Sequence, residues 1–306
     1  MAPTLSILII TYNRPEDTLA LLQNLATQEA LQQHVLEILL LNNASTVPYD
    51  IVTAFIQKRS DLPINYIDHD ENLGVARGRN FLVQKAKAPY LLVLDDDVEF
   101  ASNDAIVKAA AIFDKPHFKE HNTAIVTLNI FYFDTRARQR TAFPHKQMEA
   151  LQDKPWFLTY YFTGAAHMMH RALFDKTGLY PEDFFYGMEE YDLSYRAIDA
   201  GYTLAYDNSV VVLHKESATG RVTNKQKLAM MWLNKSKVAW RYLPKKYFYS
   251  TVAMWALQYL KKTGFDLGGF FGTLKKISGV PANNKRSAIS GGSLDYLRKV
   301  KARLWF

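Results

Sequence analysis

The chain has 306 residues, a 48% hydrophobic composition and a net charge of +7, which fits one large α/β domain with an appendage or two modest domains. Because cysteine is absent, disulfides, thiolate zinc sites and cysteine nucleophiles are excluded. No run of about 18 apolar residues occurs, so we expect no membrane-spanning helix. The first residues also lack the basic start and apolar stretch of a signal peptide, and we therefore expect a cytoplasmic protein.

Charge is distributed unevenly along the chain. Residues 225–306 contain 17 Lys and Arg and two acids, a net charge of +15, whereas the preceding 224 residues contain 20 basic and 28 acidic residues, a net charge of −8. Such segregation is typical of two surfaces with different partners. The acidic part needs a metal ion to approach a nucleotide diphosphate, and the basic part suits an anionic membrane or polymer.

The first third of the chain alternates between predicted strands and helices. Short, nearly continuous apolar runs are typical of strands buried in a parallel sheet. The strands are expected at residues 5–10, 35–41, 64–67 and 90–94, and the helices at about 15–28, 49–59 and 72–88. This order predicts a parallel sheet with right-handed crossovers.

Three consecutive carboxylates, Asp95, Asp96 and Asp97, directly follow the fourth predicted strand. Clustered charges beside a buried strand must be solvated, paired or bound to metal. Because strand side chains alternate between faces, Asp95 and Asp97 are able to converge on one cation. Mg²⁺ or Mn²⁺ held there would bind a diphosphate; the alternative is a solvated acidic turn. Ligands of parallel sheets bind at the carboxyl ends of the strands, where polar residues 11–14 and 42–45 are also expected, and this favours the metal site.

A second acidic cluster lies in residues 184–196, where an aromatic turn precedes a helix expected at 189–200. Acids in a first helical turn complement the helix dipole, and Asp192 is also spaced to pair with Arg196. A carboxylate at such a helix start, rimmed by aromatic side chains, also meets the needs of a general base. Both interpretations remain open on spacing alone.

His214 follows another strand-like run, residues 210–213. A histidine at a strand end is commonly an ordinary surface or core residue. Its neutral imidazole nevertheless suits a third ligand to a metal held by Asp97. For His167 and His170 packing is the simpler explanation.

Five segments, taken in order, resemble motifs of family 2 glycosyltransferases of the GT-A fold. They are residues 6–14, 41–45, 72–80, 95–97 and 189–196. The resemblance covers roughly residues 5–216, and rhamnosyl- and galactofuranosyl-transferase-like members that build bacterial surface glycans are the most similar. It implies a Rossmann-like GT-A catalytic domain at 1–220, with a nucleotide-sugar half at about 1–100 and an acceptor half at about 101–220. A basic, aromatic-rich helical region would follow at 221–306.

The resemblance also implies roles for individual residues. Glu190 would be the catalytic base, and Asp97, Asp95 and His214 would hold Mn²⁺ or Mg²⁺. Asp95 or Asp96 would contact ribose or sugar hydroxyls. The donor-binding residues would be Thr11, Tyr12, Arg14, Asn42, Asn72, Arg79, Asp95 and Asp96. The family commonly has Asp at the positions of Asn42 and Glu190; Asn both donates and accepts hydrogen bonds, so uracil, thymine and guanine all remain possible.

The expected activity is an inverting, metal-dependent, non-processive transfer of a hexose or deoxyhexose. The donor would be UDP-, dTDP- or GDP-linked, and the acceptor a glycan or lipid-linked hydroxyl in polysaccharide synthesis. A sugar nucleotidylyltransferase is the first alternative, but residues 11–14 are not the Gly-rich, lysine-bearing loop that it needs. A non-catalytic glycan- or lipid-binding relative is the second, although both acidic clusters are intact. The absence of spanning helices and of a Gln-x-x-Arg-Trp motif disfavours a processive synthase.

The basic segment 225–306 also carries many aromatic residues. Aromatic and basic side chains together suit the interface of an anionic membrane, so peripheral attachment to the inner face of a membrane is one expectation. The alternatives are packing against the catalytic domain or a homo-oligomer interface. We expect no nucleic-acid partner, because no recognition motif accompanies the charge.

Overall fold

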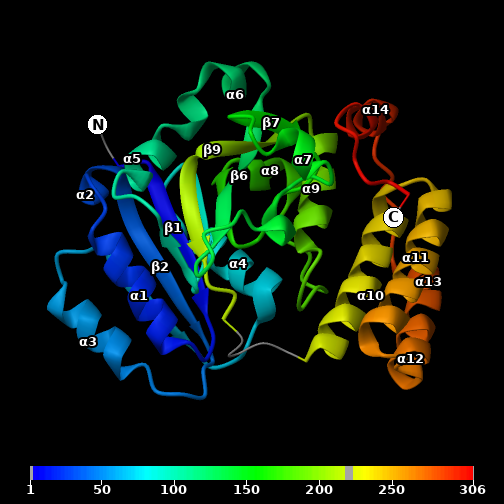
Figure 1. Cartoon of the computed structure of the whole chain (residues 1–306), viewed down its shortest axis with the longest axis horizontal. Helices are drawn as coiled ribbons and strands as arrows, with labels where there is room; N and C mark the ends of the chain where they lie inside the picture. The colour runs from blue at the N-terminus through cyan, green and yellow to red at the C-terminus, as the bar shows by residue number, and fades with distance from the viewer. Residues whose placement is uncertain (1–2, 218–222, 306) are drawn as a thin grey trace.

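A nine-stranded sheet flanked by helices is formed within residues 3–217 and 223–305, the part of the chain that the computed structural model describes (Figure 1). The strands are β1 (Leu5–Thr11), β2 (Val35–Asn43), β3 (Ile64–His69), β4 (Tyr90–Asp95), β5 (Val98–Phe100), β6 (Thr123–Tyr132), β7 (Trp156–Thr159), β8 (Ala166–His170) and β9 (Thr203–His214). The α/β architecture expected from the sequence is therefore confirmed.

Helices connect the strands and continue beyond the last of them. They are α1 (Pro15–Ala26), α2 (Leu31–His34), α3 (Asp50–Lys58), α4 (Gly74–Lys85), α5 (Ala105–Ala110), α6 (Pro116–Glu120), α7 (Met148–Leu151), α8 (Leu173–Thr177), α9 (Glu189–Asp199), α10 (Asn224–Tyr242), α11 (Lys245–Thr263), α12 (Leu267–Ser278), α13 (Val280–Asn283) and α14 (Gly291–Lys299). Two short 3₁₀ turns, η1 (Ile112–Asp114) and η2 (Arg140–Ala142), complete the described elements.

The predicted helix at 72–88 is shorter at both ends in the structure. It begins at Gly74, whose φ of +69° favours glycine and whose N–H donates to the side chain of Asn72 at 2.9 Å. It ends at Lys85, and Ala86 is already extended. A helix to residue 88 is also disfavoured by Pro89, which restricts the residue directly before it, Ala88, to extended backbone.

The sheet order is β3-β2-β1-β4-β8-β6-β9-β5, and β7 pairs with β9. β1 pairs in parallel with β2 and β4, and β2 pairs in parallel with β3. β8 is antiparallel to β4 and β6, while β9 is parallel to β6. The carboxyl ends of β1, β2 and β4 therefore meet at one edge of the sheet, at the bottom of Figure 1.

Side chains of β1 alternate between two hydrophobic cores. Ile7 and Ile9 pack in one core with Leu21 of α1. Leu8 lies in the other core, which extends to Trp232 of α10. The two-residue period of a strand requires this division. Burial on both faces explains why the strand is apolar along its length.

The helices after β9 pack on the rest of the chain through α10 and through α14, whose Tyr296 hydroxyl donates to the carbonyl of Thr159 in β7. Six aromatic side chains of this region are buried: Trp232, Trp240, Tyr242, Tyr247, Phe248 and Tyr259. They belong to the core that also contains Leu8, so packing explains this part of the aromatic content. The predicted domain boundary between residues 220 and 221 lies outside the described residues. Across 3–217 and 223–305, no helix has the length and apolar character needed to cross a bilayer.

Candidate active site

Three polar segments meet at the carboxyl edge of the sheet, as the sequence predicts. Thr11 pairs with Asn42 in the parallel register of β1 and β2, and the preceding residue, Ile10, pairs with Asp95 of β4. The Thr11 hydroxyl shares a hydrogen bond of 2.6 Å with the Tyr49 hydroxyl. These contacts join residues 11–14, 42–45 and 95–97 into one surface.

Asp95, Asp97 and His214 form a cluster with the composition of a metal site. Each offers one oxygen or nitrogen atom, and the three atoms lie within 4.8 Å of one another. His214 reaches the cluster because β9 pairs with β5, which places it opposite Val98. Asp97 and His214 are buried, and Asp95 is partly exposed. The three residues predicted as ligands are thus brought together.

Gln139 orients the imidazole of His214. Its amide nitrogen donates to Glu216 Oε1 at 2.7 Å, so its oxygen is left to accept from His214 Nδ1 at 2.9 Å. In a neutral imidazole this bond puts the free lone pair on Nε2, which lies 3.1 Å from Asp97 Oδ1. Two electron-rich atoms that face each other, with a carboxylate of Asp95 beside them, fit a divalent cation.

Without a cation, His214 has a second way to satisfy Asp97. Burial lowers the pKa of His214, but the hydrogen bond and the charge of Asp97 outweigh that effect, and the net pKa is raised. A protonated imidazole then neutralises the buried carboxylate. Metal binding would displace this proton, as is general for histidine ligands.

Arg14 ties the loop after β1 to the acidic turn. Its Nη1 lies 2.8 Å from Asp96 Oδ1 and 3.3 Å from Asp97 Oδ2. Asp96 is buried, and burial raises its pKa to about 7 although Arg14 opposes the rise. The roles predicted for Arg14 and Asp96 in donor binding stay predictions.

Arg79 of α4 connects the two acidic clusters. Its buried guanidinium lies 3.1 Å from Glu189 and 3.5 Å from Glu190, both through Nη1, and Nη2 lies 3.6 Å from Asp95. Nη2 also donates to the carbonyl of Gly164 at 3.1 Å. The role in donor binding that the resemblance implies for Arg79 stays a prediction. No local sequence pattern could predict the contact of Arg79 with Glu189, because the two residues are 110 positions apart.

The two glutamates at the start of α9 have different environments. Glu189 is 2% exposed, and burial followed by the charge of Glu190 raises its pKa well above the ordinary value. The side chain of Glu190 is 17% exposed and faces Gly164. A Cβ at Gly164 would lie 2.6 Å from Glu190 Oε1, so a glycine is needed for this approach. Glu190 is therefore the carboxylate that a substrate can reach.

The turn that presents Glu190 is held by α10. The Asn234 amide donates to the carbonyls of Tyr186 and Gly187 at 3.1 and 3.0 Å. This contact supports a strained turn, in which Gly187 and Met188 have φ of +76° and +71°. Sequence reasoning did not find Asn234, since a lone Asn in a helical pattern carries no signal of a distant turn.

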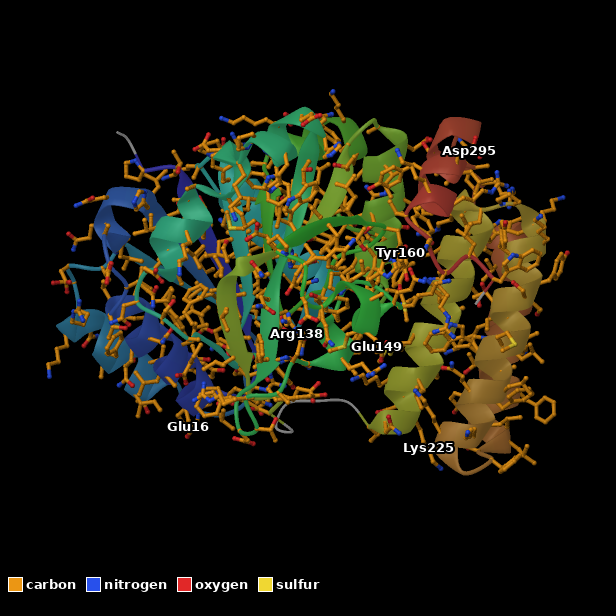
Figure 2. All side chains as sticks on the ribbon, turned by 45° about the horizontal axis from the view of Figure 1, so that its top comes forward. Glu16, Arg138, Glu149, Tyr160, Lys225 and Asp295 are labelled. Carbon is orange, nitrogen blue, oxygen red and sulfur yellow. The ribbon has the colours of Figure 1, made fainter. Side chains whose placement is uncertain are left out.

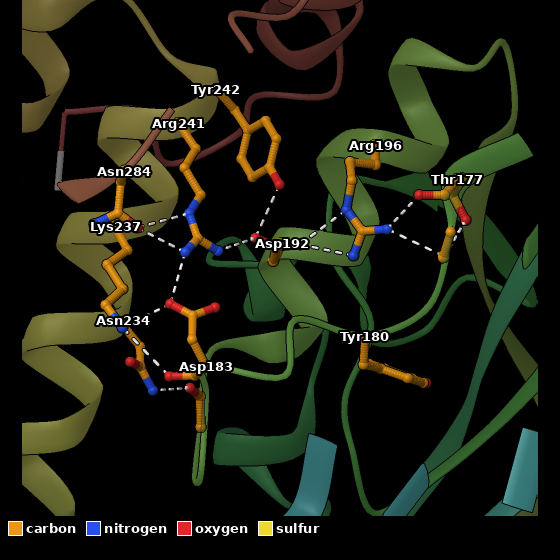
Figure 3. Close-up of polar contacts among 12 residues, drawn as sticks. Thr177, Tyr180, Asp183, Asp192, Arg196, Asn234, Lys237, Arg241, Tyr242 and Asn284 are labelled. Carbon is orange, nitrogen blue, oxygen red and sulfur yellow. Dashed lines mark hydrogen bonds and ion pairs between the residues drawn. The ribbon is translucent and has the colours of Figure 1, made fainter. Parts of the chain in front are cut away.

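Asp192 does not join the metal cluster, although it belongs to the same acidic segment as Glu190. Figure 3 shows its carboxylate between Arg196 of α9 and two residues of α10, Arg241 and Tyr242. The pairing of Asp192 with Arg196 expected from their spacing is confirmed at 2.7 Å. The residue therefore fixes α9 against α10.

The remaining predicted donor residues line the same edge. Asn42 donates to Tyr66 and Asp68, both at 2.9 Å, and Asn72 accepts from Asn43 at 3.1 Å. Tyr12 is half-buried at the end of β1. Arg138, labelled near the middle of the molecule in Figure 2, bonds to Asn129 and Tyr206. A cavity of about 370 Å³ lies beside His214 and is lined by Tyr132, Phe133, Asp134, Thr135, Ala137 and Lys215.

Known proteins resemble this chain in sequence and in fold. An uncharacterized protein of Haemophilus influenzae is 29% identical over 180 residues, which are 58% of this chain and 92% of that protein. Among solved structures, the mannosyltransferase PcManGT of Pyrobaculum calidifontis, in complex with GDP-Man and Mn²⁺, has a TM-score of 0.59 at 16% identity. The alignment covers 98% of this chain and 79% of the PcManGT chain.

Two further structures share the fold. Residues 1–349 of S. aureus TarS in complex with UDP-GlcNAc have a TM-score of 0.62 at 16% identity, covering 90% of this chain and 81% of that one. GalNAc-T7 with UDP, GalNAc and Mn²⁺ has a TM-score of 0.60 at 17% identity and covers 81% of this chain, which spans 50% of GalNAc-T7. The family model described as glycosyl transferase family 2 matches residues 6–178, more than half of the chain. The chain therefore belongs to glycosyltransferase family 2.

Proposed function

We propose that the protein transfers a sugar from a nucleoside diphosphate to an acceptor hydroxyl, with inversion at the anomeric carbon. The observation that carries the proposal is the position of Arg79. Its guanidinium contacts both Asp95, a member of the metal-site cluster, and the partly exposed Glu190. One surface thus offers a place for a diphosphate and a base for an acceptor. The fold is shared with solved structures that hold GDP-Man or UDP-GlcNAc, which supports a nucleotide-sugar donor.

Asp95, Asp97 and His214 would hold the divalent cation. When bound, it supplies positive charge that stabilises the leaving diphosphate, commonly the largest contribution of such a site. An imidazole ligand is typical of transition metals, whereas Mg²⁺ prefers oxygen. We therefore favour Mn²⁺ over Mg²⁺ as the cation. Gln139 would keep His214 in the tautomer that binds metal.

Glu190 would accept the proton of the acceptor hydroxyl as that oxygen bonds to the anomeric carbon and the bond to the diphosphate breaks. Burial raises the pKa of Glu189 well above its ordinary value and so favours the neutral form of that carboxyl. Arg79 lies 3.5 Å from Glu190 and would stabilise a negative charge on it. A neutral Glu189 adds no repulsion.

Separate observations bear on the identity of the donor nucleotide and on the place of the acceptor. Asn42 lies among Tyr66 and Asp68 at the edge where a nucleobase would bind, and its contacts leave UDP, dTDP and GDP as candidates. The likeness to rhamnosyl- and galactofuranosyl-transferases supports a role in surface-glycan synthesis with one transfer per encounter. The acceptor would bind in the cavity beside His214 and contact Tyr132 and Phe133, which line it.

Release of free nucleotide from a panel of UDP-, dTDP- and GDP-sugars tests the proposal before the acceptor is known. We expect one donor class to be hydrolysed slowly with water as acceptor, faster with a glycan extract, and only when Mn²⁺ or Mg²⁺ is present. Release that persists in the presence of a chelator, or in an Asp97→Asn variant, would contradict the metal assignment.

A further inference from the structure

A group of exposed apolar side chains surrounds the junction of α11 and α12. Leu257, Phe265, Leu267 and Phe271 are 63%, 71%, 56% and 62% exposed, and Met254 is 40% exposed. Single exposed apolar residues are normal, but several large ones around one turn are typical of an interaction site. We refer to these five residues, together with the exposed Lys261, Lys262, Lys275 and Lys276, as the junction surface.

Helical spacing arranges the junction surface into two stripes. On α11, Leu257 is three residues after Met254 and four before Lys261; on α12, Phe271 is four residues after Leu267 and four before Lys275. Residues three and four apart share a helix face. The packing of these helices uses other positions, including the buried Tyr259, Thr273 and Ile277. The exposed stripes are therefore not needed to hold the helices in place.

Positive charge at the junction surface is not offset by nearby acids in the sequence. Between residues 243 and 284 the chain contains one acidic residue, Asp266. Its carboxylate accepts from the Tyr259 hydroxyl at 2.8 Å and from the N–H of Gly269 at 3.4 Å, where it caps α12. The four lysines thus face solvent beside apolar side chains in a region of strong positive charge.

We propose that the junction surface docks on an anionic lipid bilayer. The apolar side chains would insert at the level of the headgroups while the lysines contact lipid phosphates, a combination that gives stable peripheral attachment. A second copy of the chain is a poorer occupant. The cores of protein interfaces are depleted of lysine, and a symmetric contact would place like charges together.

The junction surface lies at the end of the molecule that also carries the candidate active site. Figure 1 shows the junction of α11 and α12 at the same end of the molecule as the carboxyl edge of the sheet. Docking would therefore bring the candidate active site towards the bilayer, where an acceptor carried on a lipid is available. This last step rests on the proposed function, whereas docking itself is measured without donor or acceptor.

Co-sedimentation of the full chain with vesicles tests the proposal. We expect binding to vesicles of phosphatidylcholine mixed with phosphatidylglycerol, little binding to phosphatidylcholine alone, and loss of binding at high salt. The variant L257E/F265E/F271E should lose binding. The control variant L36E/I51E/V107E carries the same charge change at exposed apolar positions elsewhere and should still bind. K275Q/K276Q should bind about 30-fold more weakly, since each lysine contributes about fivefold.

Circular dichroism melts of each variant separate lost docking from lost folding. Wild-type protein that stays in the supernatant with anionic vesicles, or an L257E/F265E/F271E variant that binds as wild type, would overturn the proposal. Light scattering tests whether a second copy of the chain binds there instead. If the wild-type protein does not bind vesicles but forms a dimer, and the L257E/F265E/F271E variant is a monomer, the surface is a self-association site. Sugar-nucleotide turnover is expected in all these variants, so a failure of docking leaves the proposed function standing.

Discussion

The carboxylate of Asp192 accepts a hydrogen bond of 2.9 Å from the hydroxyl of Tyr242, although the two residues are 50 positions apart. Asp192 lies two residues after Glu190 in the turn of α9, and Tyr242 is the last residue of α10. Arg241 donates to the same oxygen at 3.2 Å (Figure 3). The helices that follow the sheet therefore help to hold the proposed base.

Removing the hydroxyl of Tyr242 should destabilise the protein. We expect Tyr242→Phe to lower the free energy of unfolding by about 1.5–3 kcal/mol, the range for hydrogen bonds to charged groups. Tyr249→Phe removes a hydroxyl from a side chain that is 65% exposed and should change stability by less than about 0.5 kcal/mol. Urea denaturation of both variants measures the difference. Equal unfolding midpoints would show that the contact contributes nothing.

The two adjacent glutamates should respond differently to the same substitution. Glu190→Gln removes the proposed base and should lower the transfer rate by about two to four powers of ten while donor binding is retained. Glu189→Gln replaces a carboxyl that is buried away from substrate and whose raised pKa favours its neutral form, and should leave the rate close to wild type. Rates from released nucleotide and affinities from calorimetry check both. A Glu189→Gln variant as slow as Glu190→Gln would contradict the assignment.

Gln139 should act on metal affinity through His214. Gln139→Met keeps the length of the side chain but removes the acceptor for His214 Nδ1. We expect Mn²⁺ affinity to fall by about 10- to 100-fold, the usual effect of losing a hydrogen bond to a metal ligand. Gln33→Met, at an exposed position of α2, is the matched control. Titration with Mn²⁺ gives the affinities, and thermal melts without metal report folding. Unchanged Mn²⁺ affinity in Gln139→Met would exclude the positioning role.

Lys235 of α10 should make stability depend on alkaline pH. It is buried against the ring of Tyr191, 2.9 Å from the ring centroid, and burial holds its pKa well below the ordinary value. Between this lowered pKa and the ordinary lysine pKa, the unfolded chain binds a proton that the folded chain lacks, so folding is disfavoured in that pH range. The disadvantage fades as pH rises towards the ordinary lysine pKa.

We therefore expect Lys235→Met to be more stable than wild type at neutral pH, with a gain that shrinks as the pH approaches 10. Denaturation across that range measures the gain. Lys237→Met serves as the control because the charge of Lys237 is paired with Asp183 at 2.7 Å. A gain independent of pH would mean that Lys235 is charged in the folded protein.

The first third of the fold was predictable because its signals are local. Runs such as residues 5–10 and 90–94 are apolar throughout, and strands buried on both faces require this. The carboxyl edge followed from strand order, which placed Asp95 and Asp97 there, whereas His214 was expected as a third ligand from its chemistry and from the family resemblance. By contrast, β6, β7 and β8 were not anticipated, and β9 is longer than its predicted run at 210–213.

The contacts that orient the site were beyond sequence reasoning. Arg79 meets Glu189, Gln139 meets His214, and Asn234 meets the turn at Gly187, each across a long separation in the chain. No residue pattern marks such pairs, since each depends on how α4, α9 and α10 pack. The sequence also did not distinguish buried Glu189 from partly exposed Glu190, which only tertiary burial decides.

Calorimetric binding of UDP, dTDP and GDP, each with Mn²⁺ and with a chelator, tests the central claim most directly. We predict that one nucleotide binds tightly with Mn²⁺ and loses binding with the chelator or in His214→Ala. The account would be contradicted by nucleotide binding that is equally tight with the chelator. It would also be contradicted if none of the three nucleotides bound in the presence of Mn²⁺.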